Sequence, residues 1–204
     1  MSDLHKALGD ISSIRMQMAR STEFRGYGPA TLAATSVIAI AAAGMQSLWL
    51  PDPAGHVARY LAIWISTAVL SAILTTIQMC TRSRRMHSGM SDEMIRMAVE
   101  QFLPAAGTGL LLTIVLARYV PGVLWMLPGL WQIVFSLGIF SSSRFLPRPI
   151  LAAGGWYLLT GLACLAMAGT HAFSPWAMGI PFGAGQMLVA GILLFHATEG
   201  TDEV

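Results

Sequence analysis

Charged residues are scarce in this sequence. Only 11% of its 204 residues are Asp, Glu, Lys or Arg, whereas 55% are hydrophobic; soluble domains average about 25% charged residues. A chain with so few charges cannot cover itself with a water-soluble surface, but lipid is itself an apolar solvent. The formal net charge of +2 is too small to indicate nucleic acid as a partner. The composition therefore predicts a protein that lies in a lipid bilayer.

Cysteine is rare, and ionisable groups are missing from the longest apolar segments. Two cysteines, Cys80 and Cys164, cannot build a disulfide framework, and their different expected depths in a bilayer argue against pairing. Asp, Glu, Lys, Arg and His do not occur deep in any apolar segment, although such residues usually mark proton relays and ion pathways in membranes. The absence disfavours a proton-coupled transporter, and no cofactor or metal is expected.

What the sequence does contain is six apolar segments of about 19–21 residues each. Twenty residues of helix span about 30 Å, the thickness of the hydrocarbon layer. Because every backbone polar group must be paired internally in lipid, these segments are expected to be helical. The predicted fold is all-α, a bundle of six transmembrane helices at residues 30–50, 60–80, 91–120, 122–140, 150–169 and 176–195. The third is long because Ser91 and two acids suit a helix start ahead of its apolar part, Phe102–Val120.

Basic residues are distributed unevenly between these segments. Ten lie before the first helix, between the second and third, or between the fourth and fifth, and two lie in the other connections. The ten are Lys6, Arg15, Arg20, Arg25, Arg82, Arg84, Arg85, Arg96, Arg144 and Arg148; the two are Arg59 and Arg118. Because positive loops remain cytoplasmic, both termini are predicted on the cytoplasmic side of the membrane. The expected division is a cytoplasmic helix and linker at 1–28, a membrane domain at 29–196 and an acidic tail at 197–204.

The N-terminal segment has the pattern of an amphipathic helix. Leu4, Leu8, Ile11 and Met18 recur at helical spacing, opposite polar residues. A helix of this kind can lie on the membrane, pack on its own bundle or bind another protein. A second apolar face, formed by Met90, Met94 and Met97 at the start of the third helix, is the other element of this hypothetical partner-binding surface.

A cluster of polar residues surrounds the same region. It comprises Arg84, Arg85, His87, Glu93, Arg96 and Glu100. Glu93, Arg96 and Glu100 share one helical face, which is typical of a solvated ladder of ion pairs. The alternatives are a docking surface and a catalytic site with Glu100 as base beside His87 or Arg85. Two metal sites are weaker alternatives: Cu(I) on the nearby methionines with His87, and a cluster of Asp52, His56 and His171 on the other side.

Polar and helix-breaking residues inside the membrane segments suggest a second function. Pro128 and Pro181 are expected to interrupt the fourth and sixth helices, and Gln132 and Gln186 lie close to them. Broken helices can line a substrate site, so these four residues form a candidate substrate path. Interior amides more often hold helices together. Gly179 and Gly183 form a GxxxG motif, which predicts close helix contact.

Three stretches carry a resemblance to a known group: FRGYGPA at 24–30, SRRMHSGMSDEM at 83–94 and SPWAMGIPFGAGQ at 174–186. The chain resembles a group of uncharacterised bacterial multi-pass membrane proteins, which implies a bacterial setting but no activity. The function that the sequence favours is therefore a non-enzymatic sensor, regulator or subunit that engages a protein partner through its cytoplasmic layer. That layer comprises residues 1–28, 81–101, 141–149 and 196–204. A homo-oligomer is also compatible; a transporter or channel is the alternative, and a membrane enzyme comes third.

Overall fold

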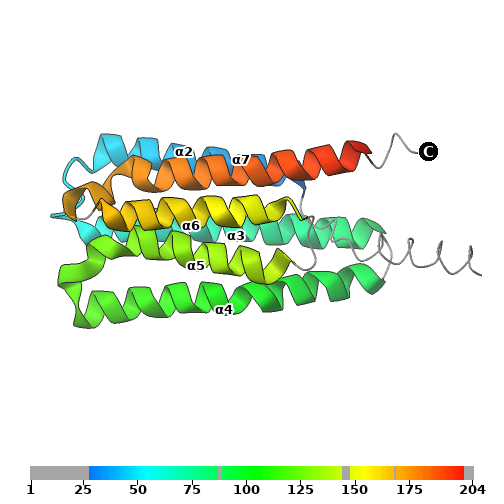
Figure 1. The fold of residues 1–204 in the computed structure, drawn as a ribbon, viewed down its shortest axis with the longest axis horizontal. Helices are drawn as coiled ribbons and strands as arrows, with labels where there is room; N and C mark the ends of the chain where they lie inside the picture. The colour runs from blue at the N-terminus through cyan, green and yellow to red at the C-terminus, as the bar shows by residue number, and fades with distance from the viewer. Residues whose placement is uncertain (1–27, 87–88, 144–147, 168, 200–204) are drawn as a thin grey trace, which may run out of the picture.

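The computed structural model describes residues 28–86, 89–143, 148–167 and 169–199, and these ranges contain no strand (Figure 1). The helices are α2 (Pro29–Trp49), α3 (Val57–Met86), α4 (Gly89–Tyr119), α5 (Leu127–Ser142), α6 (Ile150–Ala166) and α7 (Pro175–Glu199). Two 3₁₀ segments, η1 (Pro121–Met126) and η3 (Gly169–Phe173), connect α4 to α5 and α6 to α7. The predicted all-α bundle is confirmed.

Five helical segments are long and apolar enough to cross a membrane, so the chain has the architecture of a membrane-embedded protein. They are Pro29–Trp49, Val57–Thr81, Phe102–Tyr119, Pro121–Ser142 and Pro175–Phe195. The remaining helix, α6, is apolar but has only 17 residues, or about 25 Å. It ends at Ala166, before the predicted boundary at residue 169, and Gly169 itself adopts a positive φ of 77°.

The fourth apolar segment is not one continuous α-helix. It begins as the 3₁₀ segment η1, and the α-helix starts only at Leu127. Pro128 lies in the first turn of α5, where a residue without an N–H is tolerated. The carbonyl of Leu124, which Pro128 cannot bond, accepts the N–H of Leu127 instead. The apolar segment therefore changes from a 3₁₀ helix to an α-helix next to Pro128, so it is interrupted at this residue, as expected.

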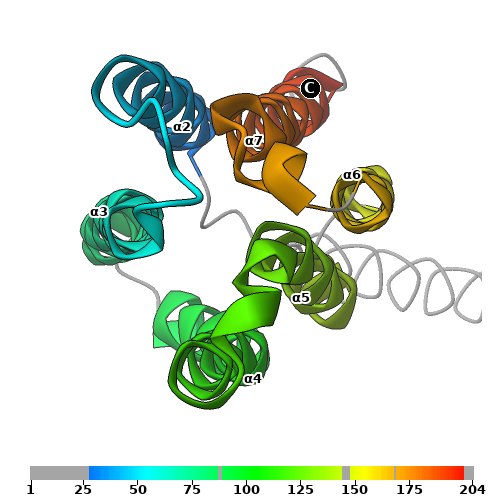
Figure 2. The ribbon, with the colours of Figure 1, turned by 90° about the vertical axis from the view of Figure 1, so that its left-hand side faces the viewer.

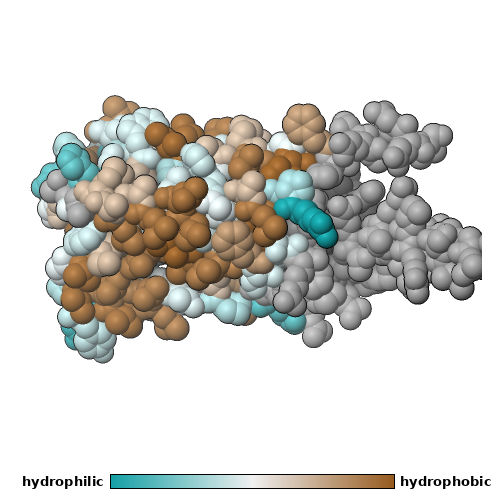
Figure 3. All heavy atoms as spheres, viewed as in Figure 1, coloured by the Kyte–Doolittle hydropathy of each residue, from teal (hydrophilic) through white to brown (hydrophobic). Residues whose placement is uncertain are grey.

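The six helices form a ring in the order α2, α7, α6, α5, α4 and α3, as the end-on view shows (Figure 2). They alternate in direction, so their connections lie at two ends. We call the end with residues 50–56, η1 and η3 the loop end, and the end with Arg84, Arg85 and Arg148 the basic end. Hydrophobic side chains cover the middle of the face formed by α4, α5 and α6 (Figure 3). This distribution fits a belt in contact with lipid.

The best-packed part of the interior lies toward the loop end. Tyr60 and Trp64 of α3 are buried against residues of α2, η3 and α7. The ring of Tyr60 meets that of Phe173 edge to face, with centroids 5.0 Å apart. Hydropathy alone suggests that Tyr60 is an interfacial aromatic, but the structure makes it a core residue. Trp49 and Tyr119, at comparable depths, are indeed exposed.

Glycines set the closest helix contacts. A Cβ added to Gly179 would lie 2.5 Å from Cβ of Ala43, and one added to Gly183 would lie 2.6 Å from Cδ1 of Ile40. The predicted GxxxG motif therefore does pack closely, and its neighbour is α2. Between α5 and α6, Gly129 and Gly161 each place the missing Cβ 2.8 Å from the carbonyl oxygen of the other.

Candidate functional site

Gln132 occupies the gap that Pro181 creates in α7. Pro181 lies inside the helix, and because it has no N–H, the carbonyl of Ala177 loses its usual i+4 donor. Gln132 of α5 supplies that donor, since its Nε2 lies 3.0 Å from the oxygen of Ala177. The same Nε2 donates to the carbonyl of Pro128 at 3.2 Å. The amide is fully buried, and it links the beginnings of α5 and α7 directly.

The other side of the proline is also bonded from a neighbouring helix. Nε1 of Trp156, in α6, donates to the carbonyl of Pro181 at 2.9 Å. Backbone groups freed by a helical proline can be satisfied by adjacent helices in a membrane bundle. Here α5 supplies the donor for the freed carbonyl of Ala177, Trp156 adds a bond to the carbonyl of Pro181 itself, and α7 continues as a helix through Pro181. The expectation that Pro181 breaks this helix is therefore wrong.

Of the four residues of the candidate substrate path, the structure brings three together. Pro128, Gln132 and Pro181 belong to the α5–α7 contact just described. Gln186 is half-buried and lies instead near the hydroxyl of Tyr157, without meeting hydrogen-bond geometry. Around Gln132 these residues form a buried, hydrogen-bonded contact between α5 and α7.

A second buried amide lies toward the loop end and was not predicted. Gln46 accepts a hydrogen bond from Nε1 of Trp64 at 2.7 Å and donates to the carbonyl of Phe173 at 2.8 Å. It thereby joins α2, α3 and η3. The sequence did contain a signal for this contact, because Gln46 is an amide near the end of an otherwise apolar segment. Burying an amide costs free energy unless it is hydrogen-bonded.

Aromatic rings connect the remaining helices. Phe135 of α5 contacts Phe102, Tyr157 and Phe182, which come from α4, α6 and α7, with centroid distances of 5.3, 4.8 and 5.4 Å. These pairs have edge-to-face geometry, which is worth about 0.5–1.5 kcal/mol each beyond burial. Between α4 and α5, Nε1 of Trp131 donates to the hydroxyl of Thr113 at 2.9 Å.

Some buried polar atoms remain without a hydrogen-bond partner in the described part of the chain. They are the hydroxyls of Tyr60, Ser142 and Tyr157 and the carbonyl oxygen Oε1 of Gln132. None is charged, and they are distributed along the bundle from the loop end to the basic end. They do not form a recognisable set of nucleophile, base and oxyanion donors.

The structure describes only some of the residues predicted to form a binding surface or polar cluster at the basic end. His87 and the N-terminal residues Leu4, Leu8, Ile11 and Met18 lie outside the described residues. The backbone is helical at the other predicted positions, but the side chains there are not described; these positions are Arg84, Arg85, Met90, Glu93, Met94, Arg96 and Met97. Glu100 is exposed. The predicted ion-pair ladder and catalytic alternative thus remain predictions.

The alternative metal site at the loop end does not form. Asp52 instead stabilises its own turn, because Oδ1 accepts the backbone N–H of Gly55 at 3.0 Å. Nδ1 of His56 lies 3.2 Å from the carbonyl oxygen of Asp52. Across the residues that the structure describes, no group of three His, Cys, Asp or Glu side chains could hold a metal ion. Cys80 and Cys164 are both free thiols, as predicted.

Comparisons with protein-family models, curated proteins and solved structures give no match to this chain.

Proposed function

We propose that this protein is a non-enzymatic membrane regulator or subunit that binds a protein partner through the basic end. The observation that carries the proposal is the length of α3 and α4. The apolar span of α3 ends at Thr81 and that of α4 begins at Phe102, yet the helices continue to Met86 and from Gly89. The part of α4 before Phe102 is about 20 Å long. We call this polar extension, residues 82–101, the hairpin.

The composition of the hairpin supports partner binding. It contains Met90, Met94 and Met97 on one helical face beside charged positions, and methionine is common on adaptable binding surfaces. The predicted amphipathic segment 1–20 reaches the bundle at the same end, because Gly28 bonds Gln78 near the end of the apolar span of α3. Two apolar faces at one end of a membrane bundle suit recognition of a helical segment.

We further propose that the basic end faces the cytoplasm of a bacterial cell and that the bundle lies in the inner membrane. The support is the excess of Arg and Lys at that end, since positive residues near membrane helices favour the cytoplasmic side.

Transport has less support than partner binding. Gln132, the central residue of the candidate path, is buried and uses its Nε2 to bond α7 and its own helix. A substrate would have to displace these bonds. The interior described by the structure also contains no ionised group that would bind a coupling ion.

The proposal is tested by co-purification from native membranes in a mild detergent. The changes Leu8→Ser and Ile11→Ser together should remove a stoichiometric protein partner while leaving the amount of inserted protein unchanged. The matched control, Lys6→Ser with Asp10→Ser, alters the opposite predicted face and should retain the partner. Loss of the partner in both variants, or in neither, would contradict recognition through the apolar face of this segment.

A further inference from the structure

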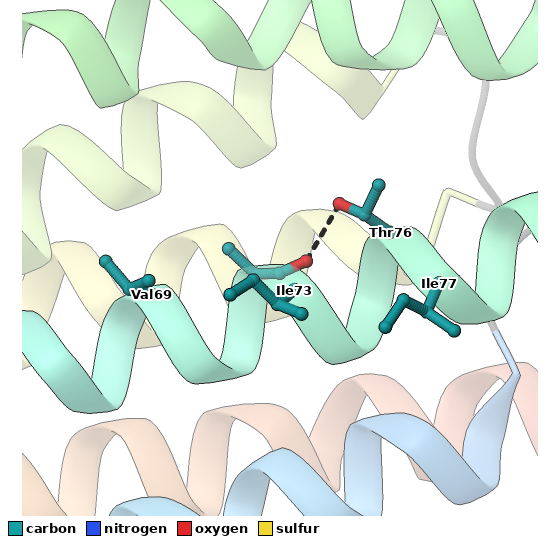
Figure 4. Close-up of a pocket in the computed structure, with 5 residues that line it drawn as sticks. Val69, Ile73, Thr76 and Ile77 are labelled. Atoms are coloured by element: carbon teal, nitrogen blue, oxygen red, sulfur yellow. Dashed lines mark hydrogen bonds between the residues drawn. The ribbon is translucent and has the colours of Figure 1, made fainter.

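The side of α3 that faces the bundle is polar along most of its apolar span. At about 100° per residue, six residues fall within an arc of about 80°. They are Tyr60, Trp64, Thr67, Ser71, Thr75 and Gln78, and we call them the polar stripe. The opposite side carries Val69, Ile73 and Ile77, which are each about half exposed and follow one another along the helix (Figure 4). The helix therefore presents apolar side chains outward and polar ones inward.

Hydrogen bonds at both ends of the polar stripe establish its orientation. Toward the loop end, Nε1 of Trp64 donates to Oε1 of Gln46, in α2, at 2.7 Å. Toward the basic end, the backbone N–H of Gly28, immediately before α2, donates to Oε1 of Gln78 at 3.2 Å. Because both ends of the stripe bond the same neighbouring segment, the residues between them also lie on the side of α3 that faces the bundle.

The two halves of the polar stripe differ in burial. Tyr60 and Trp64, toward the loop end, are buried. The four residues toward the basic end are only partly buried, and they are Thr67, Ser71, Thr75 and Gln78. These four side chains therefore keep accessible surface although they face the bundle.

The hydroxyls in the partly buried half can bond water. The hydroxyl of Thr67 donates to the carbonyl of Ile63, and that of Thr75 to the carbonyl of Ser71, both at 2.8 Å. Each hydroxyl oxygen keeps lone pairs that can accept a further hydrogen bond. Hydrocarbon has no donor to offer them, whereas water does. The stripe carries no charged side chain, so its chemistry suits uncharged polar ligands.

The buried half of the polar stripe forms a closed end. Gln46 holds Trp64 in place and donates to the carbonyl of Phe173 at 2.8 Å. The ring of Tyr60 packs edge to face on Phe173. The Tyr60 hydroxyl is buried and has no hydrogen-bond partner within the described ranges of the chain. We call Gln46, Tyr60, Trp64 and Phe173 the plug.

We propose that the polar stripe from Gln78 to Thr67 lines a path for water and small uncharged polar solutes, which enters from the basic end and stops at the plug. Hydrogen-bonding side chains along a path through a membrane protein select uncharged solutes in this way. The unpartnered hydroxyl of Tyr60 places one more polar group at the inner end of the path. The proposal does not involve the Gln132 contact and does not depend on a protein partner.

The reactivity of introduced cysteines tests the path. Ser71→Cys or Thr75→Cys is made in a chain without Cys80 and Cys164, and membranes are treated with methyl methanethiosulfonate, a small uncharged reagent. Both variants should react at least about tenfold faster than Ile73→Cys, because only the thiolate reacts and a thiol ionises beside water but not in hydrocarbon. Ile73 lies at the same depth on the outward side of α3, so it is the matched control. Mass spectrometry of the purified protein follows the modified fraction with time.

A position at the plug tests the closed end. Ile63 packs against the core cluster that contains Tyr60 and Trp64, so Ile63→Cys should react as slowly as Ile73→Cys. Reaction of Ser71→Cys no faster than that of Ile73→Cys would overturn the proposal, because lipid or protein would then cover the stripe. Reaction of Ile63→Cys as fast as that of Ser71→Cys would also overturn it, since the path would not stop at the plug.

Removal of hydroxyl groups tests the chemistry of the path. Thr67→Val with Thr75→Val nearly keeps the side-chain shape and should slow the reaction of Ser71→Cys at least about threefold, because fewer groups hold water beside the thiol. Ser66→Ala with Thr76→Val removes two exposed hydroxyls that bond only within α3, and this pair should leave the rate unchanged. Equal rates in the two backgrounds would overturn the role of the stripe.

Discussion

At the residue scale, the buried amides of this bundle serve helix contacts. Gln132 replaces a missing backbone hydrogen bond, because Pro181 leaves the carbonyl of Ala177 without its usual donor. If residue 181 carried an N–H, that residue could bond Ala177 and the bond from Gln132 would not be required. The two positions are therefore expected to be energetically coupled.

The coupling can be measured with a double-mutant cycle. Gln132→Leu should lower the free energy of unfolding by about 1–2 kcal/mol, because it leaves the oxygen of Ala177 unbonded in an apolar interior. In a Pro181→Ala background the same change should cost about 1 kcal/mol less, since the new N–H can bond Ala177. Unfolding in mixed detergent measures both values. Additive effects would show that the bond does not compensate for the proline.

Gln46 should be similarly sensitive. Gln46→Leu removes the acceptor of Trp64 and the donor to Phe173, and an unsatisfied buried group costs about 1–3 kcal/mol. Thermal unfolding in detergent should show the loss. Ser47→Ala is the matched control, because the exposed Ser47 hydroxyl bonds only within its own helix. Equal stability of the two variants would argue against a structural role for Gln46.

The sequence could indicate these residues but not their partners. An amide in an apolar segment signals a helix contact, and Gln132 was singled out on that basis, beside both prolines. Gln46 gave the same signal and was missed, and hydropathy does not reveal that Tyr60 is buried. Their roles depend on how each helix is rotated and which helix lies beside it, and hydropathy carries little information about either.

At the element scale, α2 and α7 are held together by small residues. Gly179→Ala places a methyl group 2.5 Å from Cβ of Ala43, so the helices must separate, at a cost of about 1–3 kcal/mol. Ala43→Gly should recover part of the loss by removing the opposing methyl group. Gly191→Ala is the control, since nothing lies within 4 Å of the added Cβ. Unfolding in detergent compares the four proteins, and equal costs for the two Gly→Ala variants would contradict the role of Gly179.

The elements themselves were largely predictable. Six apolar segments became six helices. α4 starts ahead of its apolar part, as predicted, but at Gly89, so that Ser91 lies inside the helix and is not its cap. The observed helix boundaries differ from the predicted ones near residues with special backbone properties. Pro128 lies in the first turn of α5, and Gly169 follows the end of α6. The pairing of α2 with α7, far apart in the chain, could not be deduced because neighbours in sequence usually pair.

At the scale of the whole molecule, the orientation in the membrane is testable. In a chain without Cys80 and Cys164, Ala54→Cys marks the loop end and Ser91→Cys the basic end. A membrane-impermeant maleimide should label Ala54→Cys in intact spheroplasts and Ser91→Cys only after permeabilisation, because positive charge retains the basic end in the cytoplasm. The reverse pattern would contradict the proposed orientation.

The hairpin makes the basic end of the bundle different from the loop end. The apolar spans of α3 and α4 are less buried than those of α2, α5 and α7, and both helices extend beyond these spans at the basic end. An extension of this kind presents recognition residues to water while the bundle anchors them. This is the central claim of the proposed function.

A photo-cross-linking scan along α4 in native membranes tests that claim most directly. A benzoylphenylalanine is placed at Met90, Met94 or Met97 in the hairpin, and at Leu103, Leu111 or Ile114 in the apolar span. The account predicts a protein adduct of one constant mass at the hairpin positions and no such adduct at the three apolar positions. An absence of protein adducts throughout the hairpin, or the same adduct at Leu111 and Ile114, would contradict it.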